Sequence, residues 1–220
     1  LFQFLDHDHF IRLFLMLALL FACCLMLQLS LPYIGGRYDI DFLLTKQSII
    51  HIKHWRYAFY FHVAFSILTL AAGFTQFSSF LQKKYRKLHR AVGYIYVVDV
   101  LFVAGPSGLI MAFYANGTLA AKSSFVILSL LWIGFTLLAA YFARKKNFPV
   151  HKNWMMRSYA LTLSAISLRF YAWLLPRFLH LDGVSEYTFI AWISWTINLL
   201  VAELLILRNM YAQSRSTNSA

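Results

Sequence analysis

The stretch SYALTLSAISLRFYAWLLP, residues 158–176, is apolar except for one charge, Arg169. A guanidinium is costly to bury in a bilayer, so it requires a partner or a water-filled cavity. We therefore expect Arg169 to face a polar interior that several helices share. The stretch also approaches the length of about 20 residues that a helix needs to cross the hydrocarbon core. Together these properties predict a polytopic membrane protein.

Five further apolar segments accompany this stretch, at residues 13–31, 57–81, 91–121, 123–143 and 187–207. The six segments predict an all-α bundle of about six transmembrane helices. The third segment is longer than a span requires and contains Gly105-Pro106, where Pro and Gly kink or break a helix. Asn116-Gly117 then predicts the turn that ends it.

The composition excludes an ordinary soluble domain. Of the 220 residues, 60% are hydrophobic and only 13% are charged, against about 25% charged in soluble domains. The net charge of +12 would suit nucleic acid, but the basic residues cluster in short loops between apolar segments, where anionic lipid headgroups are the expected counter-charge. We expect one integral membrane domain over residues 1–220, with a motif-bearing core at 57–176 and a polar tail at 209–220.

The distribution of positive charge predicts the topology. The second and fourth loops are the most basic, with Lys83, Lys84, Arg86, Lys87 and Arg90 in one and Arg144, Lys145, Lys146 and Lys152 in the other. Cytoplasmic loops carry such an excess, so both termini are expected in the cytoplasm. The first loop is also basic although it should be external, and its length allows a small surface element.

Polar and small residues form stripes on two of the predicted helices. At 3.6 residues per turn, each set lies on one helix face. The first set is His62, Ser66, Thr69, Gly73 and Gln76, and the second is His151, Met155, Ser158, Thr162, Ala165 and Arg169. Such faces point toward other helices rather than lipid. Helix packing and the lining of a site both remain open as interpretations.

His89 and His151 are the candidate ligands of a b-type haem, which membrane bundles hold between two imidazoles at one depth. Each begins a predicted helix at the cytoplasmic edge. Arg157 or Arg169 would contact the propionates, and a quinone or a partner subunit would exchange electrons. The alternative is that both histidines, beside basic residues, lie at the headgroup level.

A non-redox carrier or receptor is the second hypothesis, with a ligand pocket at His62, Gln76, Asp99 and Arg169. Intramembrane ionisable groups mark such sites or pair internally. Asp99 and Glu203 are candidates for a proton relay; the alternative is that each has one structural partner. Arg169 either binds an acidic group of a ligand or pairs internally with Asp99. The third hypothesis is an accessory subunit of a membrane complex. No hydrolase or kinase motif occurs, so these two activities have no support. The sequence leaves open whether the protein has another enzymatic activity.

Four strings carry a resemblance to a family: HVAFSILTLAAGFTQF (62–77), LHRAVGYIYV (88–97), GPSGLIMAFYANG (105–117) and HKNWMMRSYALTLSAISLRFY (151–171). Together they resemble the bacterial membrane proteins grouped as a predicted membrane domain of unknown function. The likeness implies a fold and a location in a membrane, without an activity. It places ten residues at family motif positions: His62, Gln76, His89, Arg90, Gly93, Tyr96, His151, Trp154, Arg157 and Arg169.

Two departures qualify these resemblances. The family usually has Gly-Gly where this chain has Gly117-Thr118, so the turn is expected to differ. The chain also bears a weaker likeness to cytochrome b561-type proteins, in helix number and in histidines near helix ends. It lacks the fourth histidine that a two-haem arrangement of that type requires, so at most a single haem is expected.

Overall fold

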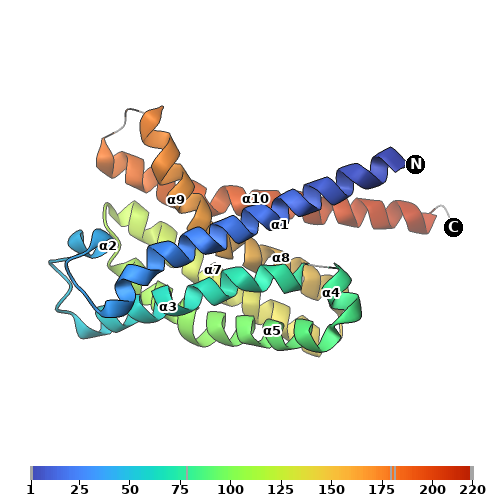
Figure 1. Ribbon diagram of the computed structural model, residues 1–220, viewed down its shortest axis with the longest axis horizontal. Helices are drawn as coiled ribbons and strands as arrows, with labels where there is room; N and C mark the ends of the chain where they lie inside the picture. The colour runs from blue at the N-terminus through green and yellow to red at the C-terminus, as the bar shows by residue number, and fades with distance from the viewer. Residues whose placement is uncertain (1, 78, 179, 181, 219–220) are drawn as a thin grey trace. The chain divides into compact units, whose positions relative to one another are not determined.

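The apolar segments fold into helices in the computed structural model (Figure 1), which describes residues 2–77, 79–178, 180 and 182–218. Within these residues no strand occurs. This confirms the predicted all-α membrane bundle. The chain divides into two compact units between Asp99 and Val100, and the prediction of one membrane domain is not tested by that division.

Unit 1 is built around one long helix that packs against two others. Its elements are α1 (Phe2–Ser30), η1 (Leu31–Gly35), α2 (Asp41–Leu44), α3 (Lys53–Gln76), α4 (Ser79–Lys84) and α5 (Arg86–Asp99). Helix α3 contacts both α1 and α5. The tighter η1 turn begins at Leu31, directly after α1, and has Pro32 as its second residue; proline disfavours a helical conformation in the residue before it.

The first loop of unit 1 is a packed element, as its length predicts. The ring of Phe59 on α3 contacts the Tyr33 ring edge-on, with the ring centroids 5.1 Å apart. It also stacks on the Trp55 ring, with the centroids 5.7 Å apart. Trp55 is 1% exposed and Leu43 is fully buried. At the surface of the same loop, the Arg37 guanidinium binds the Asp39 carboxylate and holds the pKa of Asp39 below its usual range.

Unit 2 is a helix bundle in which α8 packs against both α7 and α10. Its elements are η2 (Val100–Ala104), α6 (Gly105–Phe113), α7 (Leu119–Arg144), α8 (Phe148–Thr162), α9 (Ser164–Leu174), η3 (Leu175–Arg177) and α10 (Gly183–Asn218). Helix α7 also contacts α6, and α10 contacts α9. Helix α8 is therefore the element through which the polar side chains of this unit meet.

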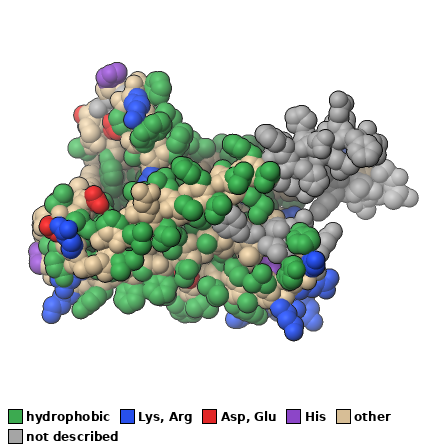
Figure 2. All heavy atoms as spheres, in the orientation of Figure 1, with side chains coloured by type: hydrophobic (Ala, Val, Ile, Leu, Met, Phe, Trp, Pro, Cys, Tyr) green, Lys and Arg blue, Asp and Glu red, His purple; other side chains and the backbone are tan. Residues whose placement is uncertain are grey.

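Four of the predicted segments form helices long and apolar enough to cross a membrane, within the described residues. They are Met16–Gly35, Arg86–Phe113, Leu119–Arg144 and Gly183–Tyr211. Many of their large apolar side chains are exposed, including Phe102 at 73%, and Figure 2 shows hydrophobic side chains over much of the visible face of the molecule. Apolar exposure on this scale fits lipid contact better than water. The two other predicted spans remain predictions.

The third predicted helix is interrupted near Gly105-Pro106, as expected. The hydrogen-bonding pattern widens to a π-helix over Val100–Ala104, and α6 then begins at Gly105. Pro106 has no N–H, so the α-helical bond to the carbonyl of Phe102 is lost. The Ser107 hydroxyl instead donates to the Val103 carbonyl at 2.6 Å. The interruption therefore begins five residues before the glycine.

The fifth predicted helix is not continuous, which corrects the expectation of a single helix over 158–176. It divides into α8 and α9 at Leu163, whose ψ of −14° belongs to a tight turn. The N–H of Ile166 donates to the Leu163 carbonyl, three residues earlier. The Thr162 hydroxyl also donates to the Ser158 carbonyl at 3.3 Å. Hydroxyl groups that bond to the backbone in this way bend helices.

The turn before α7 is formed by Gly117 and Thr118. Gly117 has φ +80°, which confirms the predicted turn at Asn116-Gly117. Thr118 begins the helix because its hydroxyl accepts the Ala121 N–H and lies 3.0 Å from the Thr188 hydroxyl. The threonine at this position thus caps α7 with a side-chain hydrogen bond that glycine, which has no side chain, cannot form.

Lys146 adopts a left-handed conformation after the last turn of α7, with φ +58°. Its N–H donates to the Ala143 carbonyl, and the Asn147 N–H donates to the Phe142 carbonyl. This pair of bonds is a Schellman motif, in which glycine is preferred. We expect Lys146→Gly to raise the stability by about 1 kcal/mol, because the left-handed strain disappears. Detergent-unfolding curves would measure it, and a less stable variant would contradict the assignment.

Candidate functional site

In unit 1, the side chain of Gln76 joins the end of α3 to the start of α5. Its amide donates to the His89 carbonyl at 3.0 Å. A Cβ at Gly93 would lie 3.3 Å from the Gln76 side-chain oxygen. Glycine at position 93 therefore leaves room for the Gln76 side chain. Both residues are at motif positions of the family resemblance, and the structure places them in contact. Tyr96, one turn further, is 1% exposed.

The polar stripe of α3 faces protein rather than lipid at its centre. Thr69 is fully buried, and Gly73 is buried one turn later. The Thr69 hydroxyl donates to the Ser66 carbonyl at 2.6 Å, so its hydrogen already has an acceptor within α3. His62 is half-buried on the same helix, and Asp99 is 4% exposed at the end of α5.

In unit 2, the predicted stripe on α8 forms a ladder of polar contacts with α7. The Ser158 and Thr136 hydroxyls lie 2.7 Å apart, and both residues are fully buried. One turn along, the Trp132 indole N–H donates to the Thr162 hydroxyl at 3.0 Å. The stripe therefore contributes to helix packing in its middle section.

His151 belongs to the same row of polar contacts between α8 and α7, at the start of α8. Its Nδ1 lies 2.8 Å from the carbonyl oxygen of Ala139 on α7. A carbonyl oxygen only accepts, so Nδ1 must carry the proton, and in the neutral ring Nε2 then has the lone pair. A histidine that donates from one nitrogen to a carbonyl has the ring orientation and tautomer of a typical metal ligand.

Arg157 and Glu203 form an ion pair between α8 and α10. The guanidinium donates Nε–H to Oε1 at 2.5 Å and Nη2–H to Oε2 at 2.7 Å. The side chains are 20% and 38% exposed. The Arg157 guanidinium also lies over the Trp154 ring, 4.6 Å from its centroid. Two roles were expected for Glu203, a proton relay or a structural ion pair. The bidentate geometry with Arg157 is that of a structural ion pair.

Asn198 on α10 joins the two sides of the break in the fifth predicted helix. Its side-chain amide donates to the Ala160 carbonyl on α8 at 3.2 Å. Its side-chain oxygen accepts from the Ser167 hydroxyl on α9 at 3.0 Å. One amide thus binds both pieces, as a polar group must where helical bonds are lost in an apolar setting.

Within unit 2, Arg169 does not lie between the helices, so this unit by itself does not form the polar interior expected around it. The side chain is exposed, and its Nη1–H donates to the Ala165 carbonyl one turn earlier at 2.9 Å. A long flexible side chain can extend along its own helix to a more polar level. The charge that α8 and α9 place between helices is that of Arg157.

The predicted site residues fall into both units. Unit 1 brings Gln76 to the backbone of His89, and unit 2 contains His151, Arg157 and Arg169. Pairing of His89 with His151 and a pocket of His62 with Arg169 each join residues of different units, so both stay predictions. Among the described residues, no group of three or more His, Cys, Asp and Glu side chains could hold a metal ion.

Sequence reasoning missed three of the polar contacts in unit 2. The Arg157–Glu203 pair was missed because each charge was assessed alone. Asn198 was missed because it is the one amide in a long apolar run, a signal the sequence does display. The Trp132 contact had no comparable signal, because an indole at mid-helix also suits lipid or core.

Comparison with known proteins agrees with the membrane fold. No curated protein and no solved structure matches the chain. The sequence model of a family described as "Predicted membrane protein (DUF2306)" matches residues 59–206. The match covers more than half of the chain, including both histidines of the expected haem pair and the Arg157–Glu203 pair. The chain therefore belongs to the DUF2306 family of predicted membrane proteins.

Proposed function

We propose that this protein binds one b-type haem and transfers electrons within the membrane, with His151 as an axial ligand. The contact between Nδ1 of His151 and the Ala139 carbonyl carries the proposal. It holds the ring in one orientation and keeps the lone pair on Nε2, the nitrogen that would bind iron. A bound haem b supplies one-electron redox chemistry.

Arg157 is the cation we assign to the propionates. It lies six residues from His151 on α8, or about 9 Å at the helical rise, whereas Arg169 lies on α9, beyond the break at Leu163. Glu203 orients the Arg157 guanidinium through two of its five N–H groups, and the others remain to donate. Arg157 thus replaces Arg169 in this role.

The second axial ligand in the proposal is His89. It rests on sequence alone: both imidazoles begin helices that run in the same predicted direction. Quinone or a partner subunit is the proposed electron partner, and the proposed location is a bacterial inner membrane with cytoplasmic termini. The excess of Lys and Arg in the second and fourth loops supports that orientation, following the positive-inside rule.

An absorption spectrum of protein purified from haem-supplemented cells tests the proposal. We expect a Soret band in the wild type, its loss in His151→Ala, and its loss or shift in His89→Ala. His180→Ala is the matched control, because His180 is exposed in the loop before α10. A wild-type protein without Soret absorbance would contradict haem binding altogether, and an unchanged His151→Ala spectrum would contradict the ligand assignment.

A small-molecule carrier is the second candidate function, and the break between α8 and α9 favours it. Membrane carriers often place substrate sites where a spanning helix is interrupted. Here Asn198 binds Ala160 and Ser167 on the two sides of the break, and polar groups of this kind can exchange partners with a ligand. The same spectrum discriminates between the candidates, since a carrier has no need of a chromophore.

A further inference from the structure

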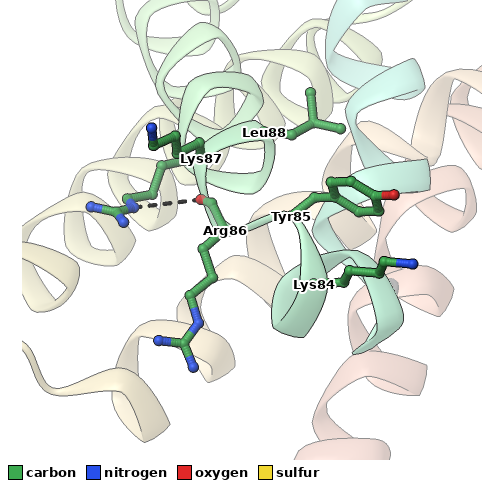
Figure 3. Close-up of a pocket in the computed structure, with 6 residues that line it drawn as sticks. Lys84, Tyr85, Arg86, Lys87 and Leu88 are labelled. Atoms are coloured by element: carbon green, nitrogen blue, oxygen red, sulfur yellow. Dashed lines mark hydrogen bonds between the residues drawn. The ribbon is translucent and has the colours of Figure 1, made fainter.

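A basic pocket lies where α4 meets α5 in unit 1 (Figure 3). Its volume is about 550 Å³, and it is lined by Lys84, Tyr85, Arg86, Lys87, Leu88 and Arg90. The Arg90 guanidinium donates to the Arg86 carbonyl at 3.4 Å, a contact that holds this side chain beside the first turn of α5. The lining does not include His89, the second haem ligand of the proposed function, but it includes the two residues on either side of His89, Leu88 and Arg90.

The positive charge of this pocket is not neutralised nearby in the chain. Four of the six lining residues are cations, and neither ion pair found in the described part of the protein includes them. From residue 42 to residue 98 the sequence contains no Asp or Glu. An uncompensated cluster of this kind attracts a phosphate or a carboxylate.

Apolar and aromatic side chains lie directly beside these cations. Phe80, Tyr85 and Leu88 are 60%, 47% and 45% exposed. The Lys84 ammonium lies 5.3 Å from the centroid of the Phe80 ring and 5.6 Å from that of Tyr85. Aromatic residues next to Lys and Arg are typical of the level where lipid headgroups meet acyl chains.

We propose that this pocket binds an anionic glycerophospholipid, with the phosphodiester at the cations and the acyl chains along Phe80 and Leu88. The helix Arg86–Phe113, which is long and apolar enough to cross a membrane, starts at the pocket, so the cations lie at a helix end. Basic pockets at such ends recognise anionic headgroups. A free phosphate would use the charges but would leave the neighbouring apolar side chains unexplained.

Native mass spectrometry of the full chain in detergent tests this site, with phosphatidylglycerol and phosphatidylcholine as probes. We expect one saturable phosphatidylglycerol and weaker, non-saturating phosphatidylcholine. Arg86→Gln/Arg90→Gln should weaken phosphatidylglycerol binding about 25-fold, since each cation near an anionic headgroup contributes about fivefold. Arg144→Gln/Lys145→Gln is the matched control, because it removes two exposed charges from the other basic loop.

Three results would overturn the proposal. The first is equal loss of binding in the two double variants, which would mean diffuse attraction by net charge. The second is equal affinity for the two lipids. The third is displacement of phosphatidylglycerol by millimolar inorganic phosphate, which would identify a phosphate site. A thermal-unfolding curve for each double variant checks folding, and the exposure of all four side chains predicts unchanged midpoints.

Discussion

Gly105→Ala is expected to destabilise the protein by about 3 kcal/mol, the upper end of the range for overpacked sites. A Cβ at this position would lie 2.2 Å from the Val100 carbonyl oxygen and 2.7 Å from Cγ1 of Ile133 on α7. The Ile133 side chain can rotate away, but the carbonyl belongs to the π-helical turn and cannot. The alanine would therefore force the turn to rearrange or separate α6 from α7.

Gly134→Ala is the matched control for that substitution. Gly134 is a helical glycine on α7, and a Cβ there would meet no atom within 4 Å. This control should be neutral or more stable by up to about 1 kcal/mol, because alanine favours the helix. Unfolding of the purified protein in increasing SDS would measure both. A Gly105→Ala protein as stable as the wild type would show that the π-helical turn is not fixed by the glycine.

The fold was predictable to the level of its helices because apolar run length and breaker residues are local properties. Gly105-Pro106 indicated the interruption of the third helix, since the missing N–H of proline is a property of that residue alone. The break at Leu163 was not predictable in the same way. The bond from Thr162 to the Ser158 carbonyl is local, but the same kind of bond occurs in the unbroken α7, from Thr136 to Trp132. The contacts of Asn198 with Ala160 and Ser167 form only after α10 packs on α8 and α9.

In the candidate site too, features set by local sequence were predictable, and features set by the packing of distant helices were not. The stripe of Ser158 and Thr162 was predicted to face other helices, and periodicity was sufficient for that. Its partners Thr136 and Trp132 required the register between α7 and α8. The exposure of Arg169 in unit 2 was not predictable, because a sequence gives the depth of a charge but not the direction of a long side chain.

Removing one partner of the Arg157–Glu203 pair should have the second large effect. Glu203→Leu leaves the Arg157 guanidinium with the Trp154 ring as its remaining contact among those described above. Loss of one partner of a buried pair costs about 3–5 kcal/mol, and we expect about 2–3 here because the Glu203 side chain is 38% exposed and partly solvated. Arg157→Met should cost a similar amount, measured by the same SDS unfolding.

The double variant Arg157→Met/Glu203→Leu separates the value of the pair from the cost of a stranded charge. Apolar residues of similar volume often replace an ion pair between helices with little loss, because two desolvation penalties disappear together. We therefore expect the double variant to be more stable than either single variant. If the pair also positions a propionate, the double variant should keep its stability and lose or shift the Soret band. Additive losses would instead show that Arg157 and Glu203 stabilise the bundle through separate contacts, and that Glu203 does not set the position of the guanidinium.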